Sequence, residues 1–145
     1  MLRRVAGIGF LETELMAALS GIVIVLVEDD PDALALFRTI LENEGATVMP
    51  APGSQSALDL LGRLRPDVLV SDMQMPDWDG AWQVTESRKR RLLNGVPTLL
   101  VTATTMTREQ VRHAGFDAYL HKPVDPKLLW QTIYYLARPE PQASA

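Results

Sequence analysis

Residues 65–80 read Arg65-Pro66-Asp67-Val68-Leu69-Val70-Ser71-Asp72-Met73-Gln74-Met75-Pro76-Asp77-Trp78-Asp79-Gly80, and the fold is organised around this stretch. Residues 68–70 form a short apolar run, typical of a strand that is buried on both faces of a parallel sheet. Asp72 follows almost at once, and Pro76 and Gly80 then interrupt regular structure. We therefore expect Asp72 at the carboxyl end of a central strand, the edge at which open α/β sheets bind their ligands.

A carboxylate in that position is a nucleophile, a metal ligand or the residue that closes the strand in an Asx turn. A second acidic strand end favours the first two roles, because the apolar run 22–27 leads directly into Glu28-Asp29-Asp30. If the two strands are neighbours, three or four negative charges crowd together, which is unfavourable unless a cation is bound or a carboxyl takes up a proton. Mg²⁺ prefers carboxylate, water and phosphate oxygens. The residues thus predict a magnesium site and phosphate chemistry together.

Composition limits the remaining possibilities. A chain of 145 residues with 47% hydrophobic content and a net charge of -4 suits one domain with a buried core. The basic run 88–91 has no interleaved aromatic residues, so we interpret it as a solvated helix face and expect no direct nucleic-acid binding. The absence of cysteine excludes disulfides and thiolate metal sites and agrees with a cytoplasmic location. His113 and His121 lie in different elements and form no ligand pair.

Apolar periodicity predicts five strands that alternate with five helices, hence a three-layer α/β fold around a parallel sheet. The expected strands are 22–27, 47–49, 68–70, 97–102 and 118–121. The expected helices begin at Asp30-Pro31, at Ser54 or Ser56 as the cap, at about Gly80 with an end at Leu93, within 105–114, and at Asp125-Pro126. The helix within 105–114 is only weakly amphipathic, so we expect it to be short.

The two ends fit this pattern less well. We assign residues 1–21 to an N-terminal extension or linker, 22–138 to the domain and 139–145 to a disordered tail. Leu11, Leu15 and Leu19 recur at helical spacing, which indicates a short helix. Glu12 and Glu14 interrupt the apolar stretch, so we expect neither a secretory signal nor a membrane span.

The predicted strand ends carry Glu28-Asp29, Asp72, Thr102 and Lys122, and this set resembles the receiver domain of bacterial two-component response regulators. The resemblance covers roughly residues 21–137. It rests on motifs that occur in the family's order: 25–30, 66–72 with Met75-Pro76 and Gly80, Thr102-Ala103, and Tyr119 with Lys122-Pro123. It implies a doubly wound, flavodoxin-like sheet with strand order 2-1-3-4-5.

The resemblance also implies a role for each matching position. Asp72 is similar to the phosphoacceptor and Lys122 to the ammonium group that pairs with it and then with the phosphoryl group. The implied Mg²⁺ ligands are Asp29, Asp72, the backbone carbonyl of Gln74 and, through water, Glu28. These assignments agree with the needs of phosphoryl transfer, which are positioning and charge neutralisation.

Thr102 and Tyr119 resemble the family's switch residues, a hydroxyl that binds the phosphoryl oxygen and an aromatic ring that moves inward. Without the motif they are read as a β-branched strand residue and a partly buried core ring. Gln74 and Thr104 match positions that tune the lifetime of the aspartyl phosphate. Lys122 follows Thr102 by 20 positions (122 minus 102), fewer than the family pattern implies, so the helix within 105–114 is expected to be shortened or displaced.

The expected function is a phosphoacceptor signalling domain that takes its phosphoryl group from a sensor histidine kinase or a histidine phosphotransfer protein. It is not an enzyme in the usual sense, although it would catalyse its own phosphorylation and slow dephosphorylation. With no effector domain expected after Ala137, the signal leaves through a protein contact, from a free-standing regulator or from the receiver of a hybrid kinase. The alternative is a receiver-like interaction module that acts without phosphorylation. A phosphohydrolase with Asp77 or Asp79 as general acid is disfavoured, because nothing suggests a substrate pocket.

Overall fold

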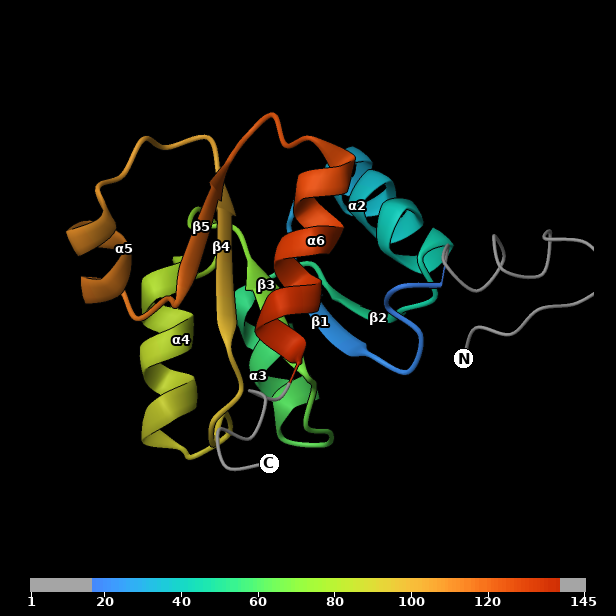
Figure 1. Ribbon diagram of the computed structural model, residues 1–145. Helices are drawn as coiled ribbons and strands as arrows, with labels where there is room; N and C mark the ends of the chain where they lie inside the picture. The colour runs from blue at the N-terminus through green and yellow to red at the C-terminus, as the bar shows by residue number, and fades with distance from the viewer. Residues whose placement is uncertain (1–16, 139–145) are drawn as a thin grey trace, which may run out of the picture.

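Five parallel strands form one sheet in the order β2-β1-β3-β4-β5 (Figure 1). The computed structural model describes residues 17–138. The strands are β1 (Val23–Val27), β2 (Thr47–Ala51), β3 (Val68–Ser71), β4 (Thr98–Thr102) and β5 (Ala118–His121). β1 pairs with β2 on one side and with β3 on the other, so that Val27 lies opposite both Ala51 and Ser71. The predicted strand order and the predicted doubly wound class are confirmed.

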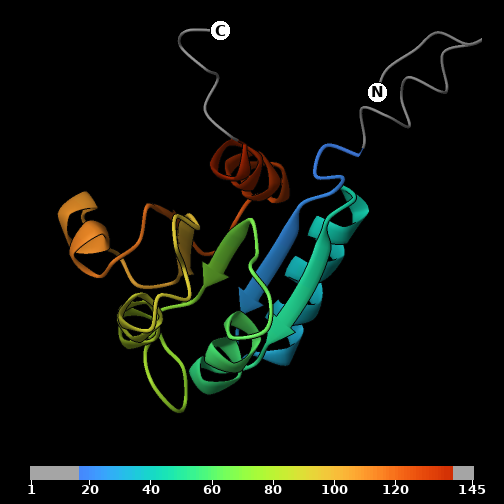
Figure 2. The same ribbon diagram turned by 90° about the horizontal axis from the view of Figure 1, so that it is seen from below.

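Helices cover both faces of the sheet and give the fold three layers, which Figure 2 shows from below. The helices are α2 (Pro31–Asn43), α3 (Ser54–Leu61), α4 (Gly80–Lys89), α5 (Arg108–His113) and α6 (Pro126–Ala137). Side chains of α2 and α6 pack into the core on one face, and side chains of α3, α4 and α5 pack into the core on the other.

Consecutive residues of the central strands point into opposite cores. In β3, Val68 and Val70 contribute to the α2–α6 side, whereas Leu69 contributes to the α3–α4 side, and all three side chains are almost fully buried. This explains why the central strands are continuous apolar runs, because neither face meets water. Because the strands are parallel, the polar residues that follow them lie together at one edge of the sheet.

Two element boundaries differ from prediction. The helix expected over 80–93 ends at Lys89, since Arg91 takes a left-handed conformation with a φ of 59° and the chain turns there, which still buries Leu93 in the core. The second strand runs on through Pro50 to Ala51, which is possible because β2 is an edge strand and a proline there costs no ladder hydrogen bond.

The cap of α3 also differs from prediction. Asp30 caps α2 as expected, by accepting a hydrogen bond from the Ala33 amide. Ser54, however, is the first residue of α3 rather than its cap, and the residue in the cap position is Gly53, which has no side chain to offer.

The basic run 88–91 is exposed, as predicted for a solvated helix face. Lys89 and Arg90 pair with Glu86 on the same helix, and Arg88 donates a hydrogen bond to the Gly115 carbonyl.

At the N-terminal side, Leu19 is fully buried in the core and its amide donates to the Glu44 carbonyl at 2.7 Å. Residues 17–21 form a turn; Leu11 and Leu15 of the predicted short helix lie outside the described residues. Within residues 17–138, no helix has the length and apolar character needed to span a membrane.

Candidate functional site

Three carboxylates converge at the carboxyl edge of the sheet. Glu28 and Asp29 follow β1, Asp72 follows the neighbouring β3, and one oxygen from each lies within 4.8 Å of the other two. The strand ladder continues far enough to hold them there, because the Asp72 amide donates to the Val27 carbonyl at 3.1 Å. Glu28 is buried, Asp72 is partly buried and Asp29 is exposed. The structure thus brings together the acids that the sequence placed on two strand ends.

Lys122 reaches this cluster from the end of β5. Its ammonium Nζ lies 2.7 Å from Glu28 Oε1 and 3.1 Å from Asp72 Oδ2. The Glu28 side chain is only 3% exposed, so this pair is held in a poorly hydrated environment. Burial by itself disfavours the charged ammonium, but the hydrogen bonds and charges of Glu28 and Asp72 outweigh it and raise the pKa of Lys122. The lysine therefore stays cationic between two carboxylates.

Asp72 is fixed through both of its carboxylate oxygens. Oδ2 accepts from Lys122, and Oδ1 accepts from the Met73 amide at 2.6 Å. The chain then turns back so closely that Gly80 donates to the Met73 carbonyl. A Cβ atom at position 80 would overlap the Asp72 carbonyl oxygen, so only glycine permits this return. The Asp72 carboxylate is consequently held at a sharp bend with a defined orientation.

The donor atoms fit a hard divalent cation. All three clustered side chains offer carboxylate oxygens, and Mg²⁺ selects oxygen ligands. Asp29 makes no side-chain hydrogen bond or ion pair within residues 17–138, which leaves its oxygens free to coordinate. Gln74 lies two residues beyond Asp72 in the same loop.

The expected switch residues form a second group, beside the cluster rather than in it. Thr102 ends β4, is 2% exposed, and its Oγ1 accepts from the Thr104 amide at 3.3 Å. The Tyr119 hydroxyl donates to the Thr104 carbonyl at 2.8 Å. No hydrogen bond joins Thr102 to Asp72 in the described part of the chain. The loop after β4 thus links Thr102 to Tyr119.

One residue near the site has a partner that the sequence did not indicate. Asp77, considered above as a general acid, accepts hydrogen bonds from the amides of Ser54 and Gln55 at the start of α3. The hydrogen bond from Gln55 lowers the pKa of the Asp77 carboxyl; burial opposes it, but the further hydrogen bonds from Trp78 and Ser54 keep that pKa below its usual value. An acid occupied in this way is poorly suited to donate a proton. The sequence did not indicate this contact, because it offered Ser54 or Ser56 as the cap of α3 and the structure places Gly53 there.

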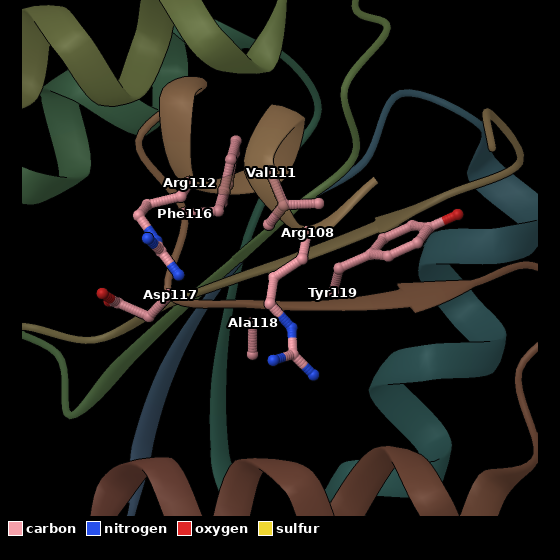
Figure 3. Close-up of a pocket in the computed structure, with 7 residues that line it drawn as sticks. All are labelled: Arg108, Val111, Arg112, Phe116, Asp117, Ala118 and Tyr119. Atoms are coloured by element: carbon pink, nitrogen blue, oxygen red, sulfur yellow. The ribbon is translucent and has the colours of Figure 1, made fainter. Parts of the chain in front are cut away.

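A pocket of about 660 Å³ lies on the α5–β5 side, apart from the acidic cluster. Its lining consists of Arg108, Val111, Arg112, Phe116, Asp117, Ala118 and Tyr119. Figure 3 shows Arg108 and Arg112 extending from α5 toward β5, with the Tyr119 ring beside the strand. The pocket shares no residue with the acidic cluster, but it includes the aromatic residue of the second group.

Comparison with known proteins identifies this arrangement. An uncharacterized 14.6 kDa protein of Leptolyngbya boryana is 42% identical over 130 residues, which cover 86% of this chain and 98% of that protein. The polar-differentiation response regulator DivK of Brucella anthropi is 30% identical over 112 residues, 76% of this chain and 91% of DivK.

Among solved structures, the receiver domain of the sensor histidine kinase PA1611 from Pseudomonas aeruginosa is 28% identical with a TM-score of 0.75, over 81% of this chain and 98% of that one. That structure holds a magnesium ion coordinated in its active-site cleft. The family described as the response regulator receiver domain matches residues 24–134. The chain therefore belongs to the receiver domain family of two-component response regulators.

Proposed function

We propose that this receiver domain accepts a phosphoryl group on Asp72 from a phosphohistidine of a sensor histidine kinase or a histidine phosphotransfer protein. The observation that carries the proposal is the Lys122 ammonium, bonded at once to Asp72 and to buried Glu28 at the edge where the acids converge. An Asp72 carboxylate oxygen attacks phosphorus and the phosphorus–nitrogen bond breaks. The electron pair of the phosphorus–nitrogen bond returns to the imidazole ring, and an acyl phosphate forms on Asp72.

The acidic cluster supports a magnesium requirement for this step. Asp29, Asp72 and the backbone carbonyl of Gln74 would hold Mg²⁺ directly, and Glu28 would hold it through water. The ion would supply positive charge to the phosphoryl oxygens during transfer. Glu28 also anchors Lys122, so one buried carboxylate would serve both cations of the site.

Lys122 has a second task after transfer. Its bond to Asp72 involves a carboxylate oxygen, whereas its shorter bond to Glu28 is independent of the acceptor. The ammonium can therefore keep Glu28 while it exchanges Asp72 for a phosphoryl oxygen. This makes Lys122 a charge partner in both states of the protein.

The second group of residues supports a switch. In the phosphorylated protein, the Thr102 hydroxyl would donate to a phosphoryl oxygen and release the Thr104 amide that it now binds. Since Tyr119 is bonded to the Thr104 carbonyl, movement of this loop would reposition the ring next to the α5–β5 pocket. Phosphorylation thus acts as a local charge event that changes a protein-binding surface. Gln74, two residues after Asp72, and Thr104, two residues after Thr102, would set the lifetime of the acyl phosphate.

The test is phosphorylation by a small donor. Purified protein is incubated with Mg²⁺ and acetyl phosphate, and intact-mass spectrometry measures the covalent phosphoryl adduct. We expect an adduct in the wild type that is lost in Asp72→Asn and without Mg²⁺. Asp59→Asn, which removes an exposed carboxylate on α3, is the matched control and should still be modified.

The contrary result is equally informative. If the wild type forms no adduct and binds no Mg²⁺, the phosphoacceptor function is wrong. The better account is then an interaction module that uses the same fold without phosphorylation.

A further inference from the structure

The loop between β3 and α4 carries residues 72–79, among them the acceptor and Gln74. Its base is closed by the hydrogen bond from Gly80 to Met73. Residues 72–79 have no regular structure of their own, and Gln74, Asp77 and Trp78 are all exposed. A loop of this kind keeps one conformation only if something outside it holds its tip.

Asp77 and Trp78 attach this tip to the start of α3. Asp77 Oδ1 accepts from the Ser54 amide at 3.1 Å, and Oδ2 accepts from the Gln55 amide at 3.0 Å. In the opposite direction, the Ser54 hydroxyl donates to the Trp78 carbonyl at 2.7 Å. Three hydrogen bonds thus join segments that are more than 20 residues apart in sequence.

The start of α3 also depends on this attachment, because its first amides lack a side-chain cap from the preceding residue. The first amides of a helix have no partner within it and normally bind the side chain of the capping residue. Gly53 occupies the cap and has none. The three heavy atoms nearest to a Cβ at position 53 all belong to the Asp77 carboxyl group, the closest at 3.1 Å, so glycine also leaves room for this carboxylate.

The helix that receives Asp77 is itself joined to the acidic cluster. The Ala51 carbonyl, at the end of β2 and three residues before α3, accepts from the Glu28 amide at 3.0 Å. The same framework therefore positions Glu28 from one side and the tip of the Asp72 loop from the other.

We propose that Asp77 is a positioning residue for the phosphorylation site: its clamp on α3 holds the loop so that the Gln74 carbonyl faces the acidic cluster and completes the magnesium site. The inference rests on the proposed function for its biological meaning, but its metal and loop readouts are measured separately. Asp77 touches neither the metal nor the phosphoryl group and acts through the backbone of its loop.

The experiment compares Asp77→Ala with the double variant Asp77→Ala/Gly53→Ser. A serine at position 53 supplies the missing cap to α3, where Gly53 has an extended φ of -163° that any residue can adopt, but it does not reattach the loop. We expect the single variant to lose thermal stability and the double variant to regain it. Asp59→Asn is the control for removing one exposed negative charge near α3.

The first readout is taken without metal. In Asp77→Ala, the amides of Ser54 and Gln55 should exchange hydrogen faster, and the emission of Trp78, which stacks on Trp82 with ring centroids 4.8 Å apart, should change. In the double variant, amide protection at the start of α3 should recover while the tryptophan emission stays altered. If the tryptophan emission is unchanged in both variants, Asp77 does not hold the loop against α3.

The second readout is the Mg²⁺ dissociation constant, measured by titration calorimetry. Loss of a residue that orients metal ligands should raise it about tenfold in both variants, although one of them has regained its stability. Two results would overturn the inference: Mg²⁺ binding in Asp77→Ala at wild-type affinity, or recovery of affinity together with stability in the double variant, which would make Asp77 only a helix cap. A wild type that binds no Mg²⁺ would overturn it too.

The two proposals fail in different ways. If the wild type forms the acetyl phosphate adduct and Asp77→Ala binds Mg²⁺ normally, only the positioning role is wrong. If Asp77→Ala weakens Mg²⁺ binding but the wild type forms no adduct, Asp77 positions the magnesium site and the phosphoacceptor function is wrong.

Discussion

The acidic cluster and the α5–β5 side of the domain are stabilised in different ways. At the acidic cluster, a lysine and two carboxylates form charge-assisted bonds of 2.7 and 3.1 Å, and the Glu28 side chain is buried. At the α5–β5 side, α5 has six residues, of which only Val111 is buried. Its first turn is capped by the side chains of Thr107 and Gln110, both exposed. One region is fixed by buried charges and the other by a few hydrogen bonds near solvent.

This contrast separates two requirements of a switch. Phosphoryl transfer needs charged groups that do not move, because its rate depends on positioning and preorganised charge. A response to that transfer needs a region that moves at small cost, and such regions have few buried contacts and exposed hydrogen bonds. If stability is divided in this way, substitutions in the acidic cluster should destabilise the whole domain and substitutions near α5 should act only locally.

Replacing Lys122 with methionine should have the largest effect. The change leaves the buried Glu28 carboxylate without its cation, which should lower the free energy of unfolding by about 3 kcal/mol. Urea denaturation of the protein without Mg²⁺ measures this loss. Adding Glu28→Gln to the same protein should recover most of it, because the charge that lost its partner is then removed. If Lys122→Met is as stable as the wild type, buried charge pairs do not stabilise the acidic cluster.

The same ion pair predicts a dependence on pH. Because the folded pKa of Lys122 lies above the unfolded value of about 10.4, its stabilisation is complete below that value and is lost as the pH rises through the folded pKa. The stability difference between the wild type and Lys122→Met should therefore shrink at strongly alkaline pH. Paired urea denaturations across this range measure the difference, which cancels the titration of other groups. A constant difference would contradict the raised pKa.

Thr107→Ala should have a smaller and local effect. It removes the side-chain oxygen that accepts from the Gln110 amide, at a cost of about 1 kcal/mol to α5. Since α5 is held mainly by Val111, we expect faster hydrogen exchange within α5 and almost no change in global unfolding. The matched control is Asp79→Ala, which removes the equivalent cap of α4 at the Trp82 amide, 2.7 Å away. If Thr107→Ala lowers global stability as much as this control does, α5 is not an independent region.

Tyr119→Phe should have the smallest effect on stability. It removes one exposed hydrogen bond to the Thr104 carbonyl, which is worth about 1 kcal/mol or less. Its effect should instead appear in the loop after β4, whose amide chemical shifts should change in the unphosphorylated protein. If those shifts stay unchanged, the Tyr119 hydroxyl does not hold the loop, and the proposed connection between Thr102 and Tyr119 is wrong.

The amino-acid pattern was enough to predict the five strands and the convergence of acids at one edge of the sheet, and the family resemblance added the strand order. These properties are local: an apolar run such as 68–70 defines a buried strand, and an acid directly after it must lie at the strand's carboxyl end. Even the shortness of α5 was visible in the spacing between Thr102 and Lys122.

The partners of these residues follow from the tertiary structure. The bond between Lys122 and Glu28 spans 94 positions, and the bonds between Asp77 and the amides of α3 span 22 and 23 positions. The residues next to them in sequence therefore do not indicate these contacts. The sequence offered Ser54 or Ser56 as the cap of α3, whereas Gly53 occupies the cap position and the carboxylate that binds the first amides of the helix comes from another loop. Local patterns determine elements because periodicity acts within one segment, whereas the pairing of polar groups depends on how the finished sheet brings separate segments together.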